Sequence, residues 1–206
     1  MPTESEKIFK DIDVSGPGGG AVVIRGGEFV MEGAAVAART SGDTKGVGVD
    51  IRVSSLDMHQ SASMSTTTTG QGDGGDVFIE TDTIRLASHA AIFAQTGDEE
   101  IQTNTGNAGN IKVKARQMNV ETGGFLSTAS GSQGEGGNLD VGAENIMLDG
   151  ENTGFMTLSG TPFPASAGNI DIKTGGLTLI NGAEIRSFTV GLAEPAIFLS
   201  MQKKYF

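Results

Sequence analysis

A glycine turn followed by a short run of alternating apolar residues recurs along the whole chain. Residues 106–113, Gly-Asn-Ala-Gly-Asn-Ile-Lys-Val, form the clearest copy. The first apolar position of each copy falls at Val22, Ile51, Val77, Ile111, Leu139, Ile170 and Ile197. Successive spacings are 29, 26, 34, 28, 31 and 27 residues, and a period of this size is typical of solenoids, propellers and other repeat arrays.

Each repeat contains two further apolar segments. In five of six repeats a second apolar triplet begins five residues after the second apolar residue of the first; the triplets begin at Phe29, Leu56, Ile84, Met118, Ile146 and Leu177. A third segment is centred on Val36, Met64, Ile92, Leu126, Met156 and Ile185. Alternation over three to five residues predicts strands with one buried face. The chain is therefore predicted to be all-β, a parallel β-helix (solenoid) of six to seven rungs of roughly 29 residues, with three short strands per rung.

The predicted rungs extend over most of the chain. We expect one β-helix repeat domain at 12–200, a polar N-terminal segment at 1–11 and a tail at 201–206. The first inward column of the domain is predicted to be the seven residues that define the period. The second is predicted to be Ile24, Val53, Ile79, Val113, Val141, Ile172 and Leu199.

The turn that precedes the first strand has its own pattern. Its last residue is acidic or an asparagine in five copies: Asp50, Asp76, Asn110, Asn138 and Asn169. Such side chains can stack and hydrogen-bond from rung to rung as a ladder. A glycine precedes each of them except Asp50, which follows Val49, and this glycine is expected to supply a positive φ at the corner. The turn therefore needs no ligand to explain it.

Charge and composition exclude several classes of function. The sequence has 14 basic and 25 acidic residues, a net charge of −11, which argues against nucleic acid and anionic membrane surfaces as partners. Without cysteine there is no disulfide and no thiolate metal site. No apolar run approaches the ~18 residues of a membrane span, so no membrane insertion is predicted.

One outward column carries two aspartates. It is predicted to read Val23, Arg52, Phe78, Lys112, Asp140, Asp171 and Phe198. Asp140 and Asp171 would lie one rung apart, as in a carboxylate pair of a polysaccharide-cleaving enzyme or a cation site. The favoured interpretation is a solvated strand face on which Lys112 pairs with Asp140.

Other candidate groups are weaker. His59 and His89 are placed in turns of adjacent rungs at different offsets, which disfavours a shared metal. Residues 72–77 resemble a calcium-binding glycine-aspartate nonapeptide but occur once, so a turn is favoured. Residues 66–69, four threonines, are expected on an exposed strand face, as plain strand surface or as acceptors of O-glycans. We predict no catalytic residue, no cofactor and no metal.

Length variation is concentrated after the third strand of each repeat. The longest or most irregular connections are 97–105 and 160–166. Insertions confined to one corner of a solenoid usually lie on an exposed edge, which is often the binding edge. We therefore expect ligand contacts in these loops.

The repeats resemble cell-surface exoproteins of the filamentous haemagglutinin type, the secreted partners of two-partner secretion. The resemblance rests on 106–113, on Ile-Arg-Gly-Gly at 24–27 and on 177–185. It implies a right-handed β-helix, export by an outer-membrane two-partner transporter, and a secreted or cell-surface location. The N-terminal secretion domain of the family, with its Asn-Pro signature, is not present in this sequence. We therefore expect the chain to be a shaft segment.

Two functions from different classes follow. The leading hypothesis is a non-enzymatic segment of an adhesin or haemagglutinin-like protein, a β-helical shaft that presents loops for attachment to a host-cell or extracellular glycan or protein. The alternative is a β-helix enzyme that acts on polysaccharide as a lyase or glycosidase, with Asp140 and Asp171 as its acidic groups.

Overall fold

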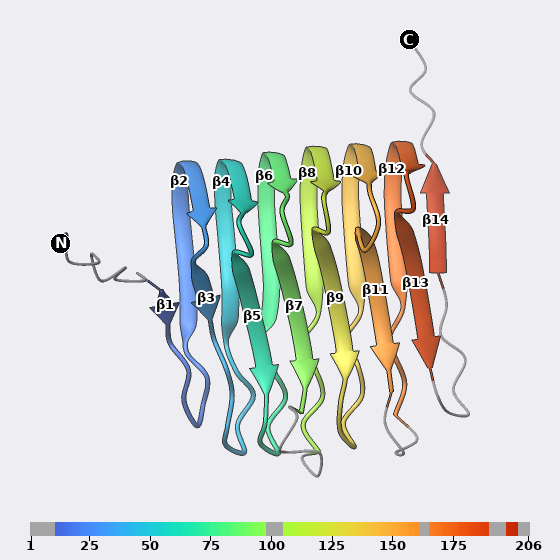
Figure 1. The fold of residues 1–206 in the computed structure, drawn as a ribbon. Helices are drawn as coiled ribbons and strands as arrows, with labels where there is room; N and C mark the ends of the chain where they lie inside the picture. The colour runs from blue at the N-terminus through green and yellow to red at the C-terminus, as the bar shows by residue number, and fades with distance from the viewer. Residues whose placement is uncertain (1–10, 98–104, 161–164, 190–196, 202–206) are drawn as a thin grey trace, which may run out of the picture.

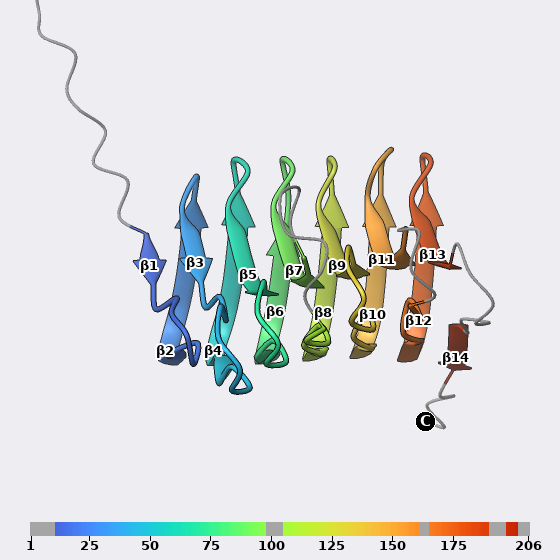
Figure 2. The same ribbon diagram turned by 90° about the horizontal axis from the view of Figure 1, so that it is seen from below.

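The chain forms a parallel β-solenoid of about six turns, as the repeat predicts. The computed structural model describes residues 11–97, 105–160, 165–189 and 197–201. Fourteen strands and no helix occur in these ranges. The strands form two seven-stranded parallel sheets that face each other, and the chain advances one coil at a time from the blue end to the red end of the ribbon (Figures 1 and 2).

One sheet, the long-strand sheet, contains the even-numbered strands. These are β2 (Ala21–Glu32), β4 (Gly48–His59), β6 (Asp76–Leu86), β8 (Ile111–Glu121), β10 (Leu139–Asp149), β12 (Ile170–Ile180) and β14 (Ile197–Met201). The opposite sheet, the short-strand sheet, contains β1 (Ile12–Asp13), β3 (Ala35–Ala37), β5 (Ser63–Thr68), β7 (Ala91–Thr96), β9 (Phe125–Ser130), β11 (Gly154–Ser159) and β13 (Glu184–Thr189). Each strand pairs with the equivalent strand of the next coil.

The first two predicted segments of a repeat are joined without a loop. In β8, for example, both apolar triplets belong to one strand of 11 residues. The β8–β10 pairing skips Arg116 and Glu144, and Arg116 and Gln117 point outward in succession. The strand therefore bends there. Each coil still has three strand segments, but the first two are continuous.

The register of β4 differs from the predicted one by two residues. Val49, not Ile51, pairs with Val77, and Ile51 pairs with Ile79. The second triplet of this repeat then begins five residues after Ile51, as in the other five repeats. Because side chains alternate with a period of two, a slip of two residues keeps the same face buried and leaves the apolar pattern unchanged.

The prediction for the third segment is wrong at one position. Phe155, not Met156, pairs with Leu126 and Ile185, and its side chain is only 1% exposed. Met156 points outward beside Ser127 and Arg186. Two large apolar residues are adjacent here, so the sequence alone does not decide which one faces the core.

The Thr66–Thr69 stretch does not lie on an exposed face as predicted. Thr66, Thr67 and Thr68 are buried, and the Thr68 hydroxyl donates to the Gly72 carbonyl at 2.6 Å. Equivalent hydroxyls of later coils behave in the same way, as Ser130 does towards Gly134. Burial of a hydroxyl is tolerated when it is hydrogen-bonded. Thr68 and Ser130 therefore connect their short strands to the glycine-rich corner.

The predicted ladder runs along that corner. The Asp76 carboxylate accepts the backbone N–H of Asn110, Asn110 accepts that of Asn138, and Asn138 accepts that of Asn169, at 2.8–2.9 Å. Asp50 is not a member, because Gly48 occupies its place opposite Asp76. The sequence therefore identified the ladder but extended it one coil too far.

Among the glycines that precede the ladder residues, the predicted positive φ is confirmed for Gly168, at 45°, but is wrong for Gly75, Gly109 and Gly137. A Cβ at Gly109 would lie 1.9 Å from the carbonyl oxygen of Gly75, and a Cβ at Gly137 would lie 1.9 Å from that of Gly109. None of these three glycines has a positive φ. They are needed because the backbones of successive coils approach each other closely.

Candidate functional site

The outward face of the long-strand sheet carries most of the charged side chains considered from the sequence. One column contains Val23, Asp50, Phe78, Lys112, Asp140, Asp171 and Phe198. Asp50 therefore takes the position predicted for Arg52. Arg52 lies two residues further along, in a column with Arg25 and Glu80. The difference follows from the two-residue shift in β4.

Asp140 and Asp171 are neighbours across β10 and β12, as predicted. Asp171 accepts a hydrogen bond from Lys173 Nζ at 2.7 Å. This hydrogen bond and the nearby charges of Asp171 and Asp140 raise the pKa of Lys173. Lys112 lies opposite Asp140 in the register, but in the part of the chain that the structure describes the two form no ion pair. The prediction that Lys112 pairs with Asp140 is thus wrong.

This carboxylate pair borders a small depression. It has a volume of about 260 Å³ and is lined by three lysines, the two aspartates and three small or apolar residues: Lys112, Lys114, Lys173, Asp140, Asp171, Val113, Val141 and Gly142. Gly142 lies between Lys114 and Lys173 in the register, so it leaves a notch between them. The depression combines acidic and basic groups in nearly equal number, and Lys173 neutralises Asp171.

An ion network occupies the N-terminal part of the same face. Asp50 binds Arg25 at 2.5 Å and Arg52 at 3.3 Å. Burial alone would raise the pKa of Asp50, but the hydrogen bonds from the two guanidinium groups outweigh it and lower the pKa. The Arg52 guanidinium and the Lys114 ammonium also lie 5.2 and 5.6 Å from the Phe78 ring centroid. The guanidinium groups are thus paired with the Asp50 carboxylate, and Arg52 and Lys114 also contact the Phe78 ring on the surface.

The two histidines occupy different positions in successive coils. His59 ends β4 and lies opposite Glu32, whereas His89 lies in the turn after β6 with φ of 64°. The predicted turn position is therefore confirmed for His89 but not for His59. Within the described ranges no three His, Cys, Asp or Glu side chains gather in a way that could hold a metal ion.

The aspartates of the 72–77 stretch serve the corner. Asp73 accepts the backbone N–H of Asn107 at 2.9 Å, and Asn107 accepts that of Glu135 at 2.9 Å. This second ladder runs beside the Asp76 ladder and was not predicted. Its signal was the Asp or Asn placed three residues before Asp76 and Asn110. The Asp73 and Asp76 carboxylates thus both accept hydrogen bonds from the next coil.

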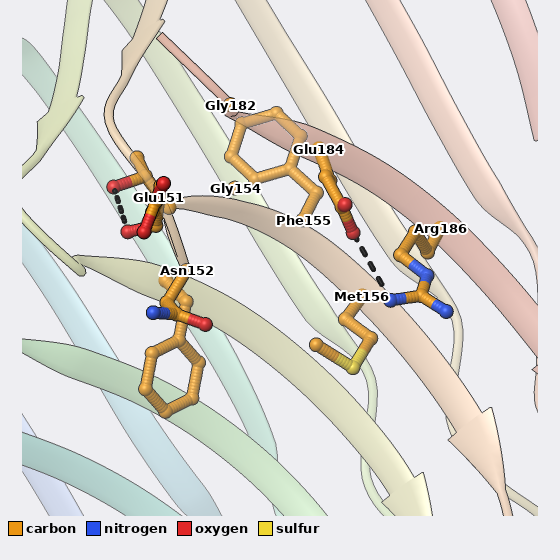
Figure 3. Close-up of a pocket in the computed structure, with 10 residues that line it drawn as sticks. Glu151, Asn152, Gly154, Phe155, Met156, Gly182, Glu184 and Arg186 are labelled. Carbon is orange, nitrogen blue, oxygen red and sulfur yellow. Dashed lines mark hydrogen bonds and ion pairs between the residues drawn. The ribbon is translucent and has the colours of Figure 1, made fainter.

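Another hollow lies on the other sheet, at the corner where β10 turns into β11. It measures about 580 Å³, within the range of small-molecule sites. Figure 3 shows Glu151 and Asn152 on one side, and Met156 with the Glu184–Arg186 ion pair on the other. We call it the β11 groove. No residue of this groove was predicted as a site.

The geometry of the β11 groove follows from one glycine. Phe125, Gly154 and Glu184 pair in register on three successive coils. Gly154 has no side chain, and a Cβ there would lie 1.8 Å from the Glu184 carbonyl oxygen. The Phe125 and Glu184 backbones lie two strand spacings apart, roughly 10 Å, and β11 between them carries no side chain at this position. The sequence signal was the glycine in a column otherwise occupied by side chains.

The loops expected to carry ligand contacts are mostly outside the described residues. Residues 98–104 of the first loop, which include the acidic run at 98–100, and 161–164 of the second are not among them. In the ranges that are described, no helix is long and apolar enough to cross a membrane.

Comparisons with known proteins identify no relative of this chain. The chain matches no protein-family model, no curated protein and no solved structure. Its function must therefore be inferred from the residues and their geometry.

Proposed function

We propose that the chain is a non-enzymatic shaft segment of a secreted or surface-exposed bacterial adhesin-like protein. The proposal rests mainly on how the recurring polar residues are used. Asp73, Asp76, Asn107 and Asn110 form hydrogen bonds between coils and are thereby committed to holding the solenoid together. A rod built from nearest-neighbour contacts is well suited to carry binding surfaces away from a cell.

Export is the second part of the proposal. The resemblance of the repeats to filamentous haemagglutinin-type exoproteins supports passage through an outer-membrane two-partner transporter. The absence of cysteine is compatible with that route, since no disulfide has to form. Fusing the chain behind a two-partner secretion domain, in bacteria that carry the matching transporter, tests it. We expect surface labelling of intact cells, and retention inside the cells would contradict it.

Attachment is tested directly with the chain itself. Fluorescent beads coated with the folded chain should adhere to host-cell monolayers or to extracellular matrix more than beads coated with the same chain after heat unfolding. Equal adhesion of the two kinds of bead would contradict the proposal.

A second candidate is an enzyme that acts on polysaccharide. It is favoured by one observation, the side-by-side register of Asp140 and Asp171 beside three lysines. Release of reducing ends from neutral and acidic polysaccharides measures such activity. If cleavage occurs and both Asp140→Asn and Asp171→Asn abolish it, the enzyme replaces the shaft as the function. We expect no cleavage, because Lys173 neutralises Asp171.

A further inference from the structure

We propose that the β11 groove binds a neutral glycan, with one sugar ring seated over Gly154 between Phe125 and the Glu184–Arg186 ion pair. This inference deepens the proposed function and rests on it for its biological role. The groove is assigned by its own lining residues, independently of the loops at 97–105 and 160–166.

The lining combines apolar and planar polar groups in the way a sugar ring requires. Phe125 and Met156 are half-buried and point outward, so they offer an apolar surface to the C–H face of a ring. Asn152 and Glu151 are exposed at the end of the groove; the Asn152 amide can donate to and accept from hydroxyl groups, and the Glu151 carboxylate can accept from them. A few placed polar groups around an apolar surface are typical of small-ligand sites.

The charge of the residues that line the β11 groove disfavours acidic sugars. Arg186 Nη1 lies 3.0 Å from Glu184 Oε2, so the only cation of the lining is already paired. Glu151 then leaves the groove with a net negative charge, on a chain whose total is −11. A uronate or sulfate would meet repulsion and no free cation. A neutral glycan meets neither obstacle.

The backbone around the groove disfavours an extended peptide as the occupant. β11 is hydrogen-bonded to β9 on one side and to β13 on the other. No strand edge is therefore free at the groove, and a peptide cannot add as another strand. The recognition groups that remain are side chains, which suit hydroxyl groups.

Affinity electrophoresis of the folded chain tests the assignment, with gels cast with a neutral glucan (laminarin), a neutral galactan or the acidic polymer alginate. We expect retardation by at least one neutral polymer and none by alginate. Phe125→Ser and Met156→Ser should each weaken the neutral affinity, the former about fivefold, because the aromatic contact with the sugar ring is lost. Phe78→Ser, a half-buried outward aromatic on the opposite sheet, is the matched control and should bind as the unaltered chain does.

Glu151→Gln provides a test of the charge argument. It retains an acceptor but removes one negative charge, so neutral binding should change less than about twofold, and alginate should still not retard the variant, because the one cation of the lining stays paired with Glu184. Three outcomes would each overturn the proposal. In the first, neither neutral polymer retards the unaltered chain, and in the second, alginate retards it more strongly than the neutral polymers do. The third outcome is that the Phe125→Ser and Met156→Ser variants bind the neutral polymer as strongly as the unaltered chain. Circular dichroism confirms that the variants are folded.

The two proposals fail in different ways. If beads adhere to cells but neither neutral polymer is retained, the groove assignment is wrong and the attachment function stands. If a neutral polymer binds through Phe125 but the beads do not adhere, the groove stands and the attachment function is wrong.

Discussion

The two sheets line the core of each coil with different side chains. In the long strand β8, the inward residues Ile111, Val113, Met118 and Val120 are large, aliphatic and at most 1% exposed. In the short strand β9 that follows, Leu126 is succeeded by Thr128 and Ser130 at the inward positions.

The reason for the difference lies at the glycine-rich corner. There the chain leaves the short strand and turns into the next long one, so its carbonyl groups are buried without a strand partner. Thr128 donates to Gly137 O and Ser130 donates to Gly134 O, each at 2.5 Å. Apolar burial thus dominates on the long-strand side, whereas satisfaction of backbone carbonyls dominates on the short-strand side.

The largest expected effect belongs to the aliphatic side. Ile79 is fully buried in the second inward column of β6. Ile79→Ala should lower the free energy of unfolding by about 2–5 kcal/mol, because it removes buried methyl groups and leaves a cavity. Urea unfolding followed by circular dichroism measures this. Val23→Ala is the control, since Val23 is 61% exposed and its truncation should change stability by less than about 0.5 kcal/mol.

The next largest effect belongs to the corner. Gly109→Ala should destabilise by about 3 kcal/mol, because its Cβ would overlap the Gly75 carbonyl and force successive coils apart. Gly27→Ala places a methyl group in open space and should be nearly neutral. Equal melting temperatures for the two variants would show that the corner is looser than the close approach of its backbones indicates.

A matched pair of threonines on the short-strand side tests the role of hydroxyl groups in the core. Thr66 and Thr128 are both fully buried in one inward column, but the Thr128 hydroxyl is bonded and the Thr66 hydroxyl has no partner in the described structure. Thr128→Val should cost about 1–2 kcal/mol, because it orphans the Gly137 carbonyl. Thr66→Val should stabilise by about 1 kcal/mol, since it removes an unsatisfied buried group. Changes of the same sign in thermal unfolding would contradict this account.

The smallest effect concerns the charged outer face. Because the folded chain lowers the pKa of Asp50, its stabilisation is complete above the usual aspartate pKa of about 4 and is lost as the pH falls through the lowered value. The side chain is 34% exposed, so the contribution should stay below about 1 kcal/mol. Asp50→Asn should flatten the melting-temperature profile between about pH 5 and pH 2. Glu80→Gln, on the same face, should leave that profile unchanged.

Much of the corner and of the long strands could be predicted from the sequence. The Asp76–Asn110–Asn138–Asn169 ladder was visible because each residue recurs immediately before an apolar triplet. The site was harder to predict. The juxtaposition of Asp140 and Asp171 follows from the repeat, but the β11 groove depends on an outward Met156 that the sequence assigned to the core.

The sequence by itself determined the solenoid, its period and the face of the long strands that is buried, because a recurring apolar pattern can be satisfied only by stacking one coil on the next. The tertiary structure decided the register of Val49 and Ile51, the inward turn of Phe155 and the burial of Thr66. The physical reason is that alternation identifies a face but not a partner. Pairing with neighbouring coils and the carbonyls of the corner fix the rest.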